Sequence, residues 1–327
     1  ENDVINYFKT IKEKQFSVTQ LERYAACPFK YFLENILDVK KIEEPTEEIE
    51  PIEMGRVLHK ILFEFYTQIR KEKIVIQNSD DETFNKAKKI LIEIANKNVD
   101  DSIFKSPLNF YEKEKILGIE NNFENSILYQ FLIEERKPSE FIPKYFEVAF
   151  GKLKKDGSDE DLISTKPIEV DDIKIGGKID RIEINEKAKS FNVVDYKLGG
   201  KKPTKNDLKD GISLQLPFYL YATKELLKQK FEEEYFPNQM IIYSLKYKQE
   251  NFGKDIVALS KEMNISDVIN NTISYIKNYV ESISNAEFNL SKLKNREQVI
   301  CKYCGHRLNC RVDDLKNEPV NEIENEE

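Results

Sequence analysis

The chain has 327 residues, enough for one large domain or two of ordinary size, and 40% of them are hydrophobic and 34% charged. These proportions predict a globular protein with a strongly solvated surface; no run approaches the roughly 18 apolar residues of a membrane span and no secretory leader opens the chain, so we expect a cytoplasmic protein. The net charge of −8 argues against nonspecific coating of nucleic acid, so any contact with a polyanion must be local.

Helical patterns dominate the first 140 residues or so. Residues 1–16 are predicted to be a lead-in with helical character. Ser17 and Gln20 have the spacing of a capping box, which predicts that a helix begins there, and Pro28 is expected to break or kink it. Further helices are predicted over 54–71, about 82–99 and about 111–136. This helical block, residues 54–137, is too large for a simple connection and is predicted to be an insertion.

Strand patterns begin at residues 143–151. Residues 175–184 and 191–200 are two further strands, and the short polar link 185–189 between them predicts a β-hairpin. Helices are expected at about 212–230 and 266–285, with a strand between them at 239–247. Helices before a hairpin, then a helix leading to another strand, are typical of an α/β fold. The acidic tail, residues 312–327, is predicted to be disordered.

Two carboxylates and one ammonium group are predicted to meet on the hairpin. Side chains alternate faces along a strand, so Asp195 and Lys197 point the same way, and a suitable register brings Asp180 beside them. Such a cluster is costly to bury unless its charge is used. A divalent metal between the carboxylates, with Lys197 beside an attacked phosphate, would use it. The alternative is a half-exposed hairpin with one salt bridge.

A run of lysines follows the hairpin and is the best local site for a polyanion. Its members are Lys197, Lys201, Lys202, Lys205 and Lys209. Their position directly after the carboxylates predicts contact with phosphate, and a solvated loop is the alternative.

The four cysteines are arranged as metal ligands rather than as a disulfide framework. Cys301, Cys304 and Cys310 form C-x2-C-x5-C, and Cys27 stands far before them. Clustered thiolates suit a metal centre, and their spacing alone does not separate zinc from an iron–sulfur cluster. If Cys27 joins the centre, the ligands hold the two ends of the domain together and close a loop that contains nearly the whole chain. An unpaired Cys27 is the alternative.

Six motifs in a fixed order resemble the AddB-type, RecB-like nuclease domains of the PD-(D/E)XK superfamily. They are YAACPFKYFL around Cys27, GRVLH ending at His59, GGKID ending at Asp180, VDYK at 194–197, QLPFY at 215–219 and the C-terminal cysteine triplet. The resemblance covers residues 17–311, which we take as one domain. Each motif alone is weak, and their order together with the distant Cys27 makes the resemblance specific.

The resemblance implies a PD-(D/E)XK core, a mixed central sheet flanked by helices, with the insertion at 54–137. It implies a [4Fe–4S] cluster on Cys27, Cys301, Cys304 and Cys310 that joins the two ends of the domain. It also implies a deoxyribonuclease, acting with Mg²⁺ or Mn²⁺ and expected to be an exonuclease. Such an enzyme degrades single-stranded or unwound DNA in double-strand break repair, beside an AddA-type helicase–nuclease subunit.

AddB proteins carry a long helicase-like region before this domain, and that region is absent here. The chain is therefore either an excised domain or a stand-alone relative. Because no Walker A motif G-x-x-x-x-G-K-[ST] occurs, we do not expect the chain itself to hydrolyse ATP.

The resemblance further implies roles for individual residues. Asp180 and Asp195 would hold the metal together with the backbone carbonyl of Tyr196, because Mg²⁺ prefers oxygen ligands. Lys197 would position or deprotonate the attacking water and hold a phosphate oxygen. The lysine run after the hairpin, rather than the resemblance, supplies the expected DNA-binding residues, Lys201, Lys202 and Lys205.

Four more residues receive active-site roles from the resemblance, and each also has a structural alternative. His59 would join the metal shell, although a histidine on a helix is often simply packed. Glu147 stands where relatives carry an acidic active-site residue, and would otherwise be an exposed strand glutamate. Gln215 and Tyr219 share a helix face and would orient the lysine or contact the DNA backbone, but the apolar residues around them also fit a packed core.

Two other functions remain open. The first is a CRISPR-associated adaptation nuclease with the same four-cysteine design, against which the large helical block argues. The second is a catalytically silent DNA-binding or scaffold module, against which the intact set of Asp180, Asp195 and Lys197 argues.

Overall fold

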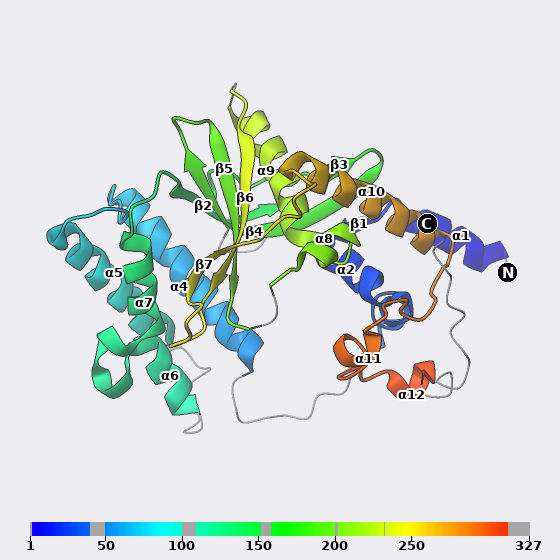
Figure 1. The fold of residues 1–327 in the computed structure, drawn as a ribbon, viewed down its shortest axis with the longest axis horizontal. Helices are drawn as coiled ribbons and strands as arrows, with labels where there is room; N and C mark the ends of the chain where they lie inside the picture. Colours follow the sequence, from blue (N-terminus) through cyan, green and yellow to red (C-terminus); the bar gives the residue numbers. More distant parts are fainter. Residues whose placement is uncertain are drawn as a thin grey trace.

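The computed structural model describes residues 2–39, 50–99, 109–151, 158–199, 202–231 and 233–312. These residues form a mixed β-sheet with helices on both of its faces (Figure 1). The α/β fold with a mixed central sheet, predicted from the sequence, is therefore confirmed. No helix among the described residues is both long enough and apolar enough to cross a bilayer.

The strands are β1 (Gln15–Ser17), β2 (Ile142–Phe150), β3 (Ile168–Val170), β4 (Ile173–Asn185), β5 (Ser190–Lys197), β6 (Phe236–Ser244) and β7 (Gly253–Ile256). The helices are α1 (Asn2–Ile11), α2 (Val18–Ala26), α3 (Pro28–Tyr31), α4 (Pro51–Lys71), α5 (Asp81–Val99), α6 (Phe110–Leu117), α7 (Ile127–Arg136), α8 (Lys205–Lys209), α9 (Gln215–Lys230), α10 (Ile265–Ser284), α11 (Arg296–Val299) and α12 (Arg307–Cys310). A π-helical turn, Phe32–Ile36, continues α3.

The long strand β4 organises the sheet. Its first residues pair with β1 in parallel and with β3 antiparallel, and the rest of it lies between β2 and β5, both antiparallel. The β4–β5 pair is the hairpin that the sequence predicted. Strand β6 is parallel to β5, which requires a crossover, and α8 and α9 provide it. Strand β7 closes this edge antiparallel to β6.

Two apolar cores lie against the sheet. Side chains on opposite faces of β5 belong to different cores. Phe191 and Val193 lie in the core that contains α2, α9 and α10, whereas Val194 and Tyr196 lie in the core that contains α4, α5 and α7. Figure 1 shows the same division, with α4 to α7 grouped on one side and α9 and α10 on the other. Asp195 follows the alternation of the first group, so it lies on the α9 side of the sheet.

The residues predicted as a lead-in pack against the first core. Phe8 and Ile11 of α1 are buried there, and β1 pairs with β4. The predicted capping box is present: the Ser17 hydroxyl accepts from the Gln20 amide, and the Gln20 side chain accepts from the Ser17 amide. Helix α2 ends before Pro28, as expected.

The helical block predicted over 54–137 consists of α4 to α7, with α4 beginning slightly earlier, at Pro51. The single helix expected at about 111–136 is interrupted between α6 and α7. Gly118 has a φ of +114°, and a Cβ there would lie 2.3 Å from the Asn122 carbonyl oxygen, so the chain turns where the periodic pattern continues. Within the predicted acidic tail, residues 313–327 lie outside the described residues.

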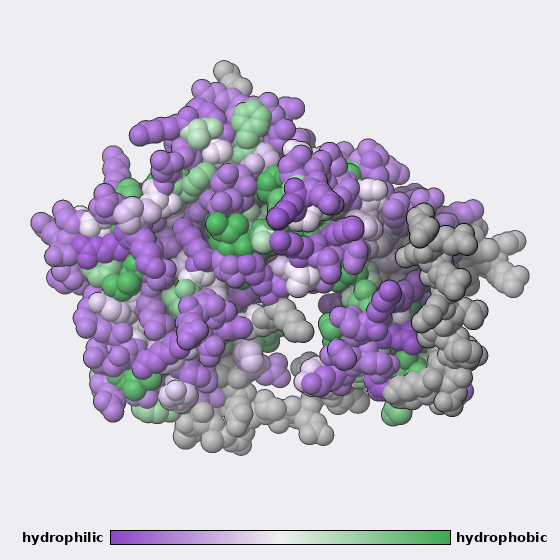
Figure 2. All heavy atoms as spheres, viewed as in Figure 1, coloured by the Kyte–Doolittle hydropathy of each residue, from purple (hydrophilic) through white to green (hydrophobic). Residues whose placement is uncertain are grey.

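Figure 2 shows that this face of the molecule is mostly hydrophilic. The surface is hollowed between the α4–α7 block and the segment that carries α11 and α12.

Candidate active site

Three carboxylates from three neighbouring strands meet near the middle of the sheet. Arg181 of β4 pairs with Val194 of β5. One residue farther along this antiparallel register, Asp180 lies opposite Asp195. On the other side of β4, the pairs that flank Glu147 put it opposite Asp180. The predicted proximity of Asp180 to Asp195 is thus a property of the hairpin register, and Glu147 joins them from β2.

His59 reaches this group from α4. Its Nδ1 lies 3.1 Å from Glu147 Oε1 and 3.7 Å from Asp180 Oδ1. Donor atoms of His59, Glu147 and Asp180 all lie within 4.8 Å of one another. Carboxylate oxygens are the ligands that Mg²⁺ and Mn²⁺ prefer, and an imidazole nitrogen is a ligand of divalent transition metals, so the donor set fits a divalent cation.

The backbone of Glu147 has a left-handed conformation, with a φ of 50°. This conformation is uncommon for a residue other than glycine, and such residues are held in place by the surrounding structure, often at functional sites. The side chain is buried and forms an ion pair with Lys178 of β4. The strained backbone therefore aims a buried carboxylate at His59 and Asp180.

Asp195 has two polar partners. Its Oδ2 lies 2.9 Å from Lys197 Nζ, and its Oδ1 accepts a hydrogen bond of 3.0 Å from Gln215 Nε2. The backbone amide of Tyr196 donates to Asp180 Oδ2 over 2.9 Å. Asp195 and Lys197 point the same way, as strand alternation predicts, and Gln215 from α9 contacts the carboxylate rather than the lysine.

The pKa values in the site reflect buried, crowded charge. Burial raises the pKa of Asp180 to about 7 even though His59 opposes the change, and burial also raises the pKa of Asp195. Burial alone would lower the pKa of His59, but the nearby Asp180 and Glu147 outweigh it and raise the pKa to about 9. Without a cation the cluster retains protons, which is the behaviour of a site that attracts positive charge.

Lys197 remains an ammonium group at neutral pH. Burial would lower its pKa, but the Asp195 carboxylate outweighs this effect and raises the pKa. Its side chain is 43% exposed, so the charge also faces the pocket beside the site.

Tyr219 lies one helical turn after Gln215 and is almost fully buried. Burial, together with the charges of Asp180 and Asp195, raises the pKa of its hydroxyl. A Cβ on Gly177 of β4 would lie 3.2 Å from the Tyr219 ring, so the ring packs directly against the strand that carries Asp180.

Sequence reasoning missed Glu22, which lies on α2. Its Oε1 accepts hydrogen bonds from the backbone amides of Leu214 and Gln215, at 2.7 and 2.8 Å. Burial raises its pKa, and Lys197 is close enough to act in the opposite direction. No local signal marks Glu22, because its partners are almost 200 positions away in the chain.

The lysines predicted to bind phosphate are dispersed. Lys202 is bonded to Asp255 of β7 at 2.5 Å, and Lys205 is exposed on the short helix α8. Lys201 lies outside the described residues. A pocket of about 670 Å³ opens beside His59 and Glu147, and the cations that line it are Arg56, Lys60, Lys178 and Lys197. Of these four, the sequence identified only Lys197.

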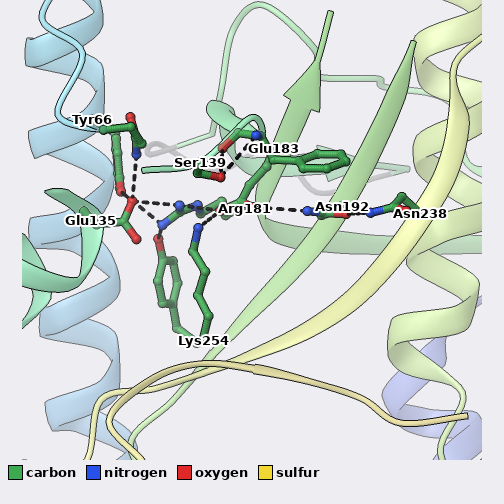
Figure 3. A network of polar contacts seen from close by, with 11 residues as sticks. Tyr66, Glu135, Ser139, Arg181, Glu183, Asn192, Asn238 and Lys254 are labelled. Atoms are coloured by element: carbon green, nitrogen blue, oxygen red, sulfur yellow. Dashed lines mark hydrogen bonds and ion pairs between the residues drawn. The ribbon is translucent and has the colours of Figure 1, made fainter. Parts of the chain in front are cut away.

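A buried polar network lies on the α4 side of the sheet (Figure 3), and its central residue, Arg181, follows Asp180 in β4. Arg181 is fully buried and donates to Glu135 of α7 at 2.7 Å, to Tyr66 of α4 at 3.0 Å and to Glu183. Lys254 of β7 also pairs with Glu183, at 2.7 Å. Two cations thus balance two carboxylates, and the network ties the helical block to the strand that carries Asp180.

The four cysteines line one cavity, although Cys27 is remote from the others in sequence. None of the four forms a disulfide bond. Burial raises the pKa of Cys301, and Cys27 and Cys304 contribute to the same change. His306 is buried, and its Nε2 lies 3.2 Å from Glu34 Oε1, which joins the C-terminal segment to the π-helical turn Phe32–Ile36.

Comparison with known proteins gives a family match over most of the chain. Residues 15–311 match the family described as the PD-(D/E)XK nuclease superfamily. A relative from Caldanaerobacter subterraneus subsp. tengcongensis, named as one of the subunits of an ATP-dependent helicase/deoxyribonuclease, is 33% identical over 224 residues. That match covers 68% of this chain and 18% of the relative.

Further matches extend over nearly the whole chain. A protein of the same name from Clostridioides difficile is 24% identical over an alignment of 382 residues, which covers 97% of this chain and 32% of that protein. The chain therefore spans a third or less of these relatives' length. The crystal structure of a putative exonuclease from Eubacterium rectale is 13% identical, with a TM-score of 0.41, over 95% of this chain and 92% of that one.

Proposed function

Because the chain belongs to the PD-(D/E)XK nuclease superfamily, we propose that it is a Mg²⁺-dependent deoxyribonuclease that hydrolyses phosphodiester bonds of single-stranded or unwound DNA. The observation that carries the proposal is the group formed by His59, Glu147 and Asp180, whose donor atoms lie within 4.8 Å of one another. Asp195 and Lys197 lie beside this group on β5.

The residues of the site divide the work of hydrolysis. His59, Glu147, Asp180 and Asp195 would hold the cation, with the Tyr196 carbonyl as a further ligand. The cation supplies Lewis-acid charge and lowers the pKa of bound water. Lys197, kept protonated by Asp195, orients the attacking water and donates to a nonbridging phosphate oxygen.

Gln215 positions Asp195 through its hydrogen bond to Oδ1. Tyr219 supports Asp180 from behind by packing against Gly177 of β4. Both residues act on the ligands rather than on the DNA. Lys202 and Lys205 would contact more distant phosphates if the strand continues past α8.

We assign Cys27, Cys301, Cys304 and Cys310 as ligands of a [4Fe–4S] cluster. The shared cavity supports a common centre. The kind of centre is proposed from the motifs: Cys27 together with the C-x2-C-x5-C triplet resembles the four-cysteine pattern of AddB-type nuclease domains, and thiolates in such sets hold iron–sulfur clusters.

The biological setting follows from the relatives' name. They are named as one of the subunits of an ATP-dependent helicase/deoxyribonuclease, and such a protein acts with other chains. We therefore propose an AddA-type helicase–nuclease partner and a role in double-strand break repair. Exonuclease action is proposed for the same reason: a nuclease beside a helicase receives a strand from an end.

Cleavage of end-labelled single-stranded DNA by anaerobically purified protein tests the proposal. The wild-type protein should cleave with Mg²⁺ and not with EDTA, and Asp195→Ala should not cleave. Binding without cleavage in Mg²⁺ and in Mn²⁺ would instead identify a catalytically silent DNA-binding module.

A further inference from the structure

The pocket beside the metal-binding group has one wall formed by a single face of α4. Ile52, Arg56, His59 and Phe63 line it at spacings of three and four residues, so they follow one another along the helix. The opposite wall is the end of β5 and the residues after it, including Leu198 and Gly199. His59 belongs to both the wall and the metal-binding group, so an occupant of the pocket directly adjoins the metal.

Gly55 also lines this pocket and lies in the interior of the 21-residue helix α4. Glycine in a helix interior makes the helix less stable than alanine does. Packing does not require it: among the described residues, nothing outside the helix lies within 4 Å of the position that a Cβ would take. Gly199, on the opposite wall, has the same open space. A side chain at either position would therefore not clash with the protein, but it would keep an external ligand away from the backbone.

The charge of the pocket identifies the class of ligand. Arg56 is exposed and has no ion-pair or hydrogen-bond partner in the described part of the chain. Lys60 is 60% exposed and has one loose contact, 4.0 Å to Glu64. Lys178 and Lys197 add two partly exposed ammonium groups. Cations beside the apolar surfaces of Ile52, Phe63 and Leu198 suit a ligand that has both phosphates and bases.

We propose that this pocket binds one or two nucleotides of a single DNA strand, next to the phosphate that is cleaved. The strand's backbone passes over Gly55 and Gly199, a phosphate pairs with Arg56, and a base packs on Phe63. A pocket of about 670 Å³ has the size of a small-ligand site, so it holds only a short stretch of one strand, and a base can pack on Phe63 only where it is unpaired. The proposal rests on the deoxyribonuclease function and adds where the substrate strand lies.

Binding can be measured without cleavage. The probe is a fluorescent oligothymidylate of six nucleotides, in a buffer with Ca²⁺ in place of Mg²⁺, and the readout is anisotropy together with the thermal unfolding temperature of each variant. The variants are Gly55→Ala, Gly55→Leu and Arg56→Ala. Lys71→Ala is the matched control, because Lys71 is an exposed cation on the same helix and does not line the pocket.

The expected effects of Gly55→Ala on stability and binding have opposite signs. It should raise the unfolding temperature, because alanine is the better helix former, and it should weaken oligonucleotide binding. Gly55→Leu should weaken binding more. Arg56→Ala should weaken it about tenfold and reduce its salt dependence, whereas Lys71→Ala should bind like the wild type.

Wild-type affinity in both Gly55→Leu and Arg56→Ala would overturn the subsite, and if these variants still cleave DNA with Mg²⁺ the nuclease function stands. A blunt hairpin duplex serves as a second probe. If Gly55→Leu and Arg56→Ala weaken duplex binding as much as they weaken oligothymidylate binding, the single strand is overturned as the occupant. A wild-type protein that neither binds nor cleaves would overturn the function and the subsite together.

Discussion

The carboxylate of Glu22 accepts a hydrogen bond of 2.8 Å from the backbone amide of Gln215, and this contact joins α2 to the N-terminus of α9. The Gln215 side chain then donates to Asp195. A negative charge at a helix N-terminus satisfies amides that have no partner within the helix. Glu22 thus fixes the turn from which Gln215 reaches the active site, and it does so from α2, the helix that Cys27 directly follows.

Glu22→Ala should lower kcat about tenfold and leave KM for DNA nearly unchanged, because Gln215 loses its support while the DNA contacts remain. Glu22→Gln keeps an acceptor oxygen and should recover most of the activity. Steady-state cleavage assays of both variants measure this. Equal activity of the alanine variant and the wild type would show that α9 needs no such support.

Lys197→Ala should abolish cleavage and leave the fold intact, because the side chain is partly exposed and its role is chemical. Cleavage assays and circular dichroism measure the two effects. Lys71→Ala removes an exposed lysine of α4 that lies outside the pocket and should be fully active. Near-normal cleavage by Lys197→Ala would remove this lysine from the mechanism.

Metal binding should weaken as the pH falls. The raised pKa of Asp180, about 7 in the metal-free protein, means that below pH 7 a cation must displace a proton. His59, with a pKa of about 9, requires the loss of another proton before it can bind the metal. We therefore expect Mn²⁺ to bind at least about tenfold more tightly at pH 8 than at pH 6.

Calorimetric titration in buffers with different ionisation enthalpies measures both the affinity and the protons released. An affinity that is constant between pH 6 and 8, with no proton release, would mean that neither side chain is a ligand.

Arg181→Ala should destabilise the fold by roughly 3–5 kcal/mol, because it leaves the buried Glu135 and Glu183 with too little compensating charge. Urea unfolding measures the change. Lys137→Ala breaks a surface ion pair with Glu134 and should cost less than about 1 kcal/mol. A small loss in the arginine variant would mean that the network is less important to stability than its burial implies.

Each single Cys→Ala substitution at positions 27, 301, 304 and 310 should lower the iron and acid-labile sulfide content of the protein together with its unfolding temperature. Elemental analysis of anaerobically purified protein measures the metal. Stoichiometric zinc and no iron in the wild-type protein would contradict the iron–sulfur assignment while leaving the nuclease site untouched.

The sequence contained the parts of the site that depend on local rules. Strand alternation placed Asp195 and Lys197 on one side, and the short polar link predicted the hairpin that brings Asp180 to them. The resemblance to known nucleases added His59, Glu147 and Gln215, whose side chains the structure brings to the same group.

The remaining features depend on contacts between distant segments. Glu22 meets α9 only through the tertiary fold, and Arg56 becomes a pocket residue only because α4 lies beside β5. The strands β1, β3 and β7 have three or four residues each, too few for a periodic pattern to reveal them. The lysine run looked continuous in sequence, but Lys202 turns to Asp255 instead of the site.

The cavity shared by Cys27 and the three C-terminal cysteines also sets an order of events during synthesis. A ribosome makes Cys27 early and Cys310 almost 300 residues later, so the four thiols can meet only after nearly the whole domain has been translated. Until then Cys27, which directly follows the helix that carries Glu22, cannot join a centre with the three C-terminal cysteines. A growing or truncated chain can therefore pair the hairpin and place its carboxylates, but it completes the support of its active site last.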